Sequence, residues 1–370
     1  MRGGGRLREE GALGDLALLA DTHLSITGAN LAYRIGSFSA GGTLTIDNSG
    51  LIGEQTTLSA PSALIRDSHI LSDSGTGTLL LAGAQWTIHD NTRIEELGSV
   101  TFSGAQTIEL QNTAITAGSI DATASSGLRL IQTELAGQTL RLQTPNAAGS
   151  GIVIDQSTLS FDDTITLESA STIELRTSRI ENFNSLEAVA GGDLAVSGSG
   201  ITGGEVLLDG ASQTLDGIIE GDHVDLISVG SITAATAGLE INAGALDVSA
   251  QSIDLTHSTL HVGTGLAQKG QDPDMLELLE DVAPGLLPAT SAPNAAFIAQ
   301  DGVSLGTLTI DGGYLFVRAP FLGAVSIAAP GDLFYNYRPF SDSAPIQVDP
   351  NSGSFEVGGS LTLAFGGTGD

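Results

Sequence analysis

Residues 107–130 have the sequence TIELQNTAITAGSIDATASSGLRL, in which a strand-like segment, a polar corner and a second strand-like segment follow one another. The same order then begins again. Alternation of apolar residues with threonine and other polar residues, bounded by Gly, Ser and Asn, is typical of β-strands. A short unit that repeats along a chain is typical of solenoid proteins.

The repeat has a fixed inner pattern. An apolar anchor is followed three positions later by a hydroxyl or amide residue, and five positions later by a second apolar residue. In the copy at Ile88 the second apolar residue comes one position late, at Ile94. The anchors are Ile46, Ile65, Ile88, Leu110, Leu130, Ile154, Leu175, Val196 and Leu255. The polar positions are Ser49, Ser68, Asn91, Thr113, Thr133, Ser157, Ser178, Ser199 and Ser258.

The spacing of the first eight anchors averages about 21 residues. Two or three short strands with tight corners fit that length, which suits one coil of a parallel β-helix. One coil cannot bury its inward face alone, but coils stacked about 4.8 Å apart place each inward side chain on its equivalent in the next coil. The sequence therefore predicts an all-β fold, a parallel β-helix with about 21 residues per coil.

The hydroxyl or amide that the copies share at the third position has a structural explanation. Strand hydrogen bonding lapses at a corner, and a short polar side chain can bond to nearby backbone groups there. Stacked corners are expected to form a polar ladder. Glycine, with 49 of the 370 residues, supplies other corner conformations with positive φ.

The pattern also suggests how the chain is divided. Residues 44–262 are predicted to form the β-helix, preceded by a lead-in or capping segment at 1–43. Residues 263–301 contain a proline-rich stretch and one short helical pattern, DMLELLEDV, and are predicted to be a loop insertion. Strand patterns resume in residues 302–370, where we expect further coils or a C-terminal cap, continuing beyond these residues.

Composition restricts the partners. Thirteen basic residues against 43 acidic ones give a formal net charge of −30, which repels nucleic acid and anionic lipid. The absence of cysteine excludes disulfides and thiolate metal sites. No stretch approaches the roughly 20 apolar residues that span a bilayer. We therefore expect neither nucleic-acid binding nor membrane insertion.

The first twenty residues, MRGGGRLREEGALGDLALLA, do not have the form of a secretion signal. Such a signal needs a basic start followed by an uninterrupted apolar core. Here Glu9 and Glu10 follow the arginines, and Asp15 interrupts the apolar run. If the protein is exported, its targeting signal is expected outside these residues.

The segments GSFSAGGTLTIDNSG (36–50) and SLEAVAGGDLAVSGSGI (185–201), with the copies from Leu110 to Ile201, resemble the filamentous haemagglutinin family of bacterial exoproteins. The resemblance implies a right-handed β-helix in a secreted or cell-surface rod that acts as an adhesin or spacer. It also implies surface glycans or proteins of a host or neighbouring cell as binding partners, and an outer-membrane secretion partner for the full-length protein. The NPNG-like and NPNL-like motifs of the family's secretion domain do not occur in this chain.

An alternative is a β-helical polysaccharide lyase or glycoside hydrolase acting on extracellular polymers. Such enzymes need clustered carboxylates, or calcium with a basic group. The best local candidate is the adjacent pair Asp162 and Asp163, which we interpret as acids at a solvated corner. Gly-His-Gly and Arg-Ile-Lys strings are absent, and the chain has one lysine, Lys269.

The six histidines do not form a recognisable motif. His257 and His261 are four residues apart, a spacing that brings side chains together on a helix but not across a strand and corner. Asp222 and His223 resemble a catalytic dyad, but no serine motif accompanies them. Calcium-roll and EF-hand motifs are also absent. The sequence analysis therefore predicts surface histidines, a protein that is not an enzyme, and no catalytic, cofactor-binding or metal-binding residues.

Overall fold

The computed structural model describes residues 14–263, 294–311, 313–319, 326–330, 333–337, 354–357 and 361–365. The fold is all-β: parallel strands stack into a β-solenoid of about 13 turns with roughly 21 residues per coil, as the repeat predicted. The chain divides into two compact units, Met1–Ala195 and Val196–Asp370. No helix in the described residues is long and apolar enough to cross a membrane.

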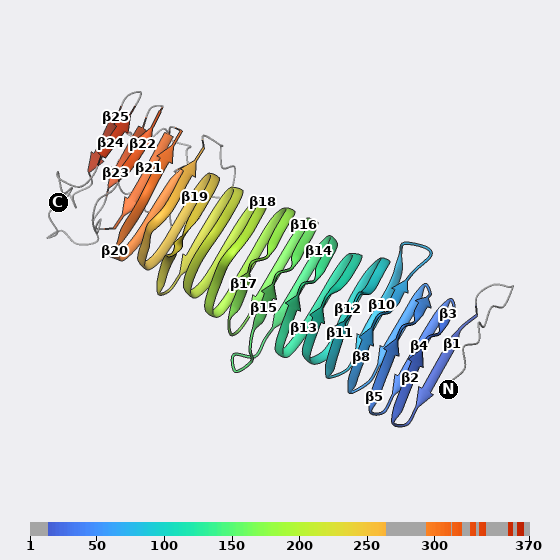
Figure 1. Cartoon of the computed structure of the whole chain (residues 1–370). Coiled ribbons are helices and arrows are strands. Elements are labelled where there is room, and N and C mark those ends of the chain that lie inside the picture. Colours follow the sequence, from blue (N-terminus) through green and yellow to red (C-terminus); the bar gives the residue numbers. More distant parts are fainter. Residues whose placement is uncertain are drawn as a thin grey trace, which may run out of the picture. The chain divides into compact units, whose positions relative to one another are not determined.

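The first unit contains short strands at its start and longer, bent strands further on (Figure 1). Its strands are β1 (Leu16–Ala20), β2 (His23–Thr27), β3 (Asn30–Ala32), β4 (Ile35–Ala40), β5 (Thr43–Asp47), β6 (Gly50–Ile52), β7 (Gln55–Ser59), β8 (Ser62–Arg66), β9 (His69–Leu71), β10 (Gly77–Ala82), β11 (Gln85–His89), β12 (Thr92–Gln111), β13 (Thr113–Ile131), β14 (Glu134–Thr144), β15 (Ile152–Asp155), β16 (Thr158–Ser169), β17 (Ile173–Arg176) and the first part of β18 (Arg179–Ser228).

The second unit contains the rest of β18 and the strands after it. These are β19 (Ser231–Val262), β20 (Ala295–Ile310), β21 (Gly313–Arg318), β22 (Ser326–Ala329), β23 (Leu333–Tyr337), β24 (Ser354–Val357) and β25 (Leu361–Phe365). Parallel pairing continues through this unit, from β18 with β19 and β19 with β20 to β23 with β25.

At the start of the first unit each coil has three strands, and each strand pairs in parallel with the strand three elements later. Thus β1 pairs with β4, β2 with β5 and β3 with β6. Coils therefore already occupy residues 16–43, the range for which the sequence suggested a lead-in or capping segment. The predicted insertion at 263–301 lies outside the described residues except at 263 and 294–301, where β20 begins. Its predicted helix is not among the described residues.

The repeat anchors form one continuous inward column. Each is the register partner of the next: Ile26, Ile46, Ile65, Ile88, Leu110, Leu130, Ile154 and Leu175. All eight are buried, with at most 5% of each residue exposed. Burial of one such side chain stabilises a fold by about 1.5–3 kcal/mol. The stacking of like on like predicted from the sequence is confirmed, and Ile26 extends the column by one coil.

The polar ladder is also present. Ser49, Ser68, Thr113 and the equivalent hydroxyl residues further along are all buried. Their hydroxyls donate to backbone carbonyls at the corner: Ser157 Oγ lies 2.8 Å from Asp155 O. Some also accept from the coil before, since Thr133 N donates to Ser157 Oγ at 3.0 Å. The ladder thus joins consecutive coils as well as closing each corner.

One position in the ladder was predicted wrongly. The buried hydroxyl in the Ile88 copy belongs to Thr92, not to Asn91. Asp90 and Asn91 both have positive φ, 56° and 57°, so this corner contains an extra left-handed residue. The extra residue moves the hydroxyl and the following Ile94 one position later.

A second feature of the corner was not predicted. In nine coils the residue before the ladder position has a φ between 46° and 62°, a conformation that favours Gly, Asn and Asp. The ladder position carries a hydroxyl in all of these coils but the first, where it is Ala29. The residues concerned are Gly28, Asn48, Asp67, Asn91, Asn112, Gln132, Gln156, Thr177 and Gly198. This column of left-handed residues turns the chain from one strand into the next.

Candidate functional site

Most of the residues that the sequence singled out for chemistry are exposed side chains or pair with a single carboxylate. Asp162 and Asp163 are both exposed on β16. His257 is exposed, and His261 pairs with Asp311, with Nε2 3.3 Å from Oδ1. In the first unit, His69 pairs with Glu95 on the following coil at 3.1 Å.

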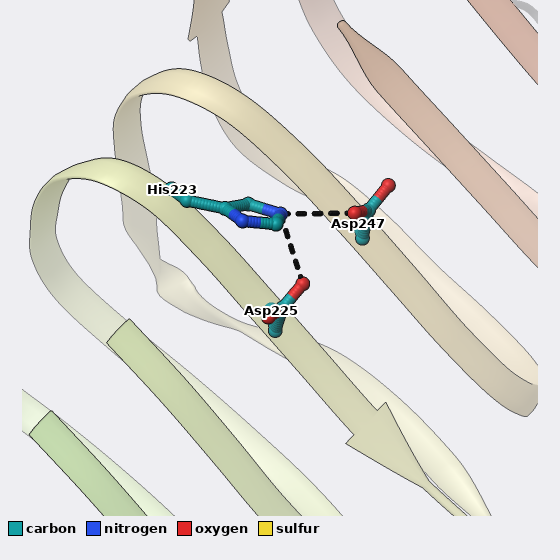
Figure 2. A group of neighbouring side chains, drawn as sticks. All are labelled: His223, Asp225 and Asp247. Carbon is teal, nitrogen blue, oxygen red and sulfur yellow. Dashed lines mark hydrogen bonds and ion pairs between the residues drawn. The ribbon is translucent and has the colours of Figure 1, made fainter. Parts of the chain in front are cut away.

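His223 has different surroundings, because it lies between two aspartates. His223 and Asp225 are two residues apart on β18, and the alternation of a strand places both on the same face. Asp247 on β19 is the register partner of Asp225. Figure 2 shows the imidazole pointing toward both carboxylates, one on its own strand and one on the neighbouring coil. These three residues are called the His223 cluster below.

The distances within the cluster are those of direct contacts. His223 Nε2 lies 3.0 Å from Asp225 Oδ1 and 2.9 Å from Asp247 Oδ2. The exposed fraction of the side chains is 14% for His223, 26% for Asp225 and 36% for Asp247. The imidazole is therefore mostly buried, and the carboxylates form the solvent-facing side. This differs from the surface position expected for His223.

The two aspartates set the charge of the histidine. Hydrogen bonds to Asp225 and then to Asp247 raise the pKa of His223 to about 9, against the opposing effect of burial. In the absence of another cation, the imidazole is protonated at neutral pH, and the cluster carries a net charge of −1. Two of its atoms, Nδ1 of His223 and Oδ1 of Asp247, are buried and have no hydrogen-bond partner among the described residues.

The sequence drew attention to Asp222 beside His223, a pair that resembles a catalytic dyad but was interpreted as surface side chains. Asp222, its neighbour in the sequence, is exposed and is not part of the cluster. Successive residues of a strand point to opposite faces, so the residue two positions away is the better partner. The spacing His-x-Asp, with a further Asp one coil later, was the signal that could have found the cluster.

Among the described residues, the His223 cluster is the group of three potential metal ligands whose donor atoms all lie within 4.8 Å of one another. It combines one imidazole nitrogen with two carboxylate oxygens. Histidine and aspartate are both ordinary ligands of zinc, and three protein ligands leave a position for water. The arrangement can also act as an ion-pair bridge between two coils when no metal is present.

A separate polar surface lies along the corner of the first unit. A groove of about 300 Å³ is lined by amides, hydroxyls and two charged residues, including Asn112, Gln132 and Arg93. A second groove of about 480 Å³ shares Asn91 and Arg93 with it. The corner amides bond to one another between coils, with Gln132 Nε2 3.0 Å from Gln156 Oε1. The two grooves are together called the corner groove below.

Comparison of the chain with protein families, curated proteins and solved structures finds no match. The case for a function therefore depends on the fold, the corner groove and the His223 cluster.

Proposed function

We propose that this chain is a non-enzymatic β-helical segment of a secreted or cell-surface protein, in which it acts as an adhesin or a spacer. The observation that carries the proposal is the register of the repeat. Eight apolar anchors stack in one buried column, so the inside of each coil is used for stability. Each further coil adds about 4.8 Å to the stack and a fresh strip of outward side chains. A stack of this kind suits a protein that extends over a distance and presents outward side chains to a partner.

The corner groove is the best candidate for contact with a partner. Its amides and hydroxyls can donate and accept hydrogen bonds, as sugar hydroxyls and peptide groups require. The net charge of −30 disfavours acidic polymers and favours neutral glycans or protein surfaces. We propose surface glycans or proteins of a host or neighbouring cell as the partners.

The resemblance to filamentous haemagglutinin-like exoproteins supports the same setting. On this proposal the full-length protein leaves the cell with the help of an outer-membrane secretion partner. Secretion would be tested by expressing the full-length protein with and without a candidate partner and measuring the amount outside the cell.

The binding experiment uses the labelled, purified chain on cell surfaces and on a neutral-glycan array. An adhesin binds in this assay, and Asn112→Ala with Gln132→Ala weakens binding. Thr116→Ala, an exposed change on β13 outside the groove lining, serves as the matched control. A spacer gives no binding.

A polymer assay tests the enzymatic alternative. The chain is incubated with polygalacturonate and alginate, and unsaturated and reducing ends are followed. Robust turnover that is lost in Asp162→Ala or Asp163→Ala would refute the proposal and favour a lyase or hydrolase.

A further inference from the structure

We propose that His223, Asp225 and Asp247 bind one divalent transition-metal cation, best matched by zinc, that bridges two neighbouring coils of the second unit. The inference stands independently of the proposed adhesin or spacer function, because it rests on the geometry and chemistry of these three side chains alone.

The positions of the ligand atoms fit a single cation. Atoms bound to one metal at about 2.1 Å stand about 3.0 Å apart at right angles and about 3.4 Å apart in a tetrahedron. His223 Nε2 is 3.0 Å from Asp225 Oδ1 and 2.9 Å from Asp247 Oδ2. A small outward rotation of the two aspartates is therefore enough to admit a cation between the three atoms.

The cluster has more acceptors than donors. The Nε2–H of His223 supplies one proton toward two carboxylates, while Nδ1 of His223 and Oδ1 of Asp247 are both buried without a hydrogen-bond partner among the described residues. A divalent cation bound to the imidazole nitrogen and to both aspartates balances the two negative charges of the carboxylates.

The backbone holds the ligands in place before any cation binds. His223 and Asp225 are fixed on one face of β18 by the strand alternation, and Asp247 is fixed beside Asp225 by the parallel register. Little conformational entropy is lost when such a site is filled. The same geometry makes the cation a bridge across the strand pair β18–β19.

The ligand types select the kind of cation. Calcium and magnesium prefer all-oxygen sites, whereas imidazole with carboxylates suits zinc and its neighbours in the first transition row. Three protein ligands with a partly exposed fourth side match the open zinc sites that retain a water molecule. The exposed faces of Asp225 and Asp247 leave room for that water.

The test is a titration of the full chain with Zn²⁺ after removal of metal by EDTA, followed by calorimetry near neutral pH. We expect one cation per chain. Asp247→Asn should weaken binding at least about tenfold, since even changes beyond the direct ligands cost that much.

His261→Gln is the matched control, because His261 also pairs with one aspartate, Asp311, in the same unit but has no second carboxylate at Nε2 within the part of the chain that the structure describes. This variant should bind zinc as the unchanged chain does. Asp225→Asn is the second ligand variant, and circular dichroism of each metal-free variant establishes that it is folded. Absence of a one-to-one event, or equal binding by the Asp247 and Asp225 variants and the unchanged chain, overturns the proposal.

Discussion

Replacing Ser157 by alanine tests whether the polar ladder stabilises the stack of coils. Ser157 is 2% exposed, and its hydroxyl accepts from Thr133 N at 3.0 Å and donates to Asp155 O at 2.8 Å. The substitution leaves the N–H of Thr133 without an acceptor in a buried corner. A buried group that loses its only partner costs about 1–3 kcal/mol.

The cost should be local, because each coil of a solenoid contacts only its neighbours. Hydrogen exchange measured on peptides that cover Thr133 reports the opening of this corner. A cost of about 1–3 kcal/mol corresponds to exchange about 5-fold to about 160-fold faster at the Thr133 amide. Coils several turns away should exchange at their original rates.

Two further variants provide controls. Ser25→Ala removes an exposed hydroxyl that lies 3.3 Å from Thr27 Oγ1, and it should leave exchange unchanged. Ser157→Thr keeps the hydroxyl, and threonine already occupies the same ladder position at Thr113 and Thr133, so protection at Thr133 should be retained. If the Thr133 amide exchanges at the same rate in the Ser157→Ala and Ser25→Ala variants, the ladder adds no stability and the apolar columns alone hold the coils together.

Three other predictions follow from particular residues. In EDTA, where no cation is bound, the pKa of His223 is about 9 in the folded chain and 6.5 in the unfolded chain. The stabilisation from its bound proton is therefore complete below pH 6.5 and is lost as the pH rises through 9. Urea unfolding should show a loss of about 2–3 kcal/mol over that range that is missing in His223→Gln. Gly137→Ala would place Cβ 1.8 Å from Ala117 O and should lower the thermal midpoint sharply, whereas Gly200→Ala, with open space around it, should not. Thr177 has a φ of 49°, which a β-branched residue adopts less readily than asparagine. Thr177→Asn should therefore raise the free energy of unfolding, measured in urea, by up to about 1 kcal/mol.

The stacking of the first unit could be predicted because its repeat is written in apolar residues at near-constant spacing. The coil that begins at Ile26 was missed because Ala29 stands where the other coils have a hydroxyl, although Ala29 N still donates to Ser49 Oγ at 3.2 Å. Thr92 was misplaced because a spacing rule cannot detect a second left-handed residue at Asn91. Backbone conformation at a corner therefore decides the register wherever side-chain chemistry alone is ambiguous.

The His223 cluster was missed for a different reason. In a parallel solenoid the neighbours of a side chain are two residues away on its own strand and about one coil away on the next. Ion pairs in the first unit obey the same rule, since Arg66 meets Asp47 at a separation of 19 residues and His69 meets Glu95 at 26. Asp225 and Asp247 are 22 residues apart, but the repeat is blurred after Val196, so no register was available to bring them together. Sites in such a sequence can be found only once the register of the coils is known. Side chains that are adjacent in the chain point to opposite faces of a strand, whereas side chains one coil apart lie in contact.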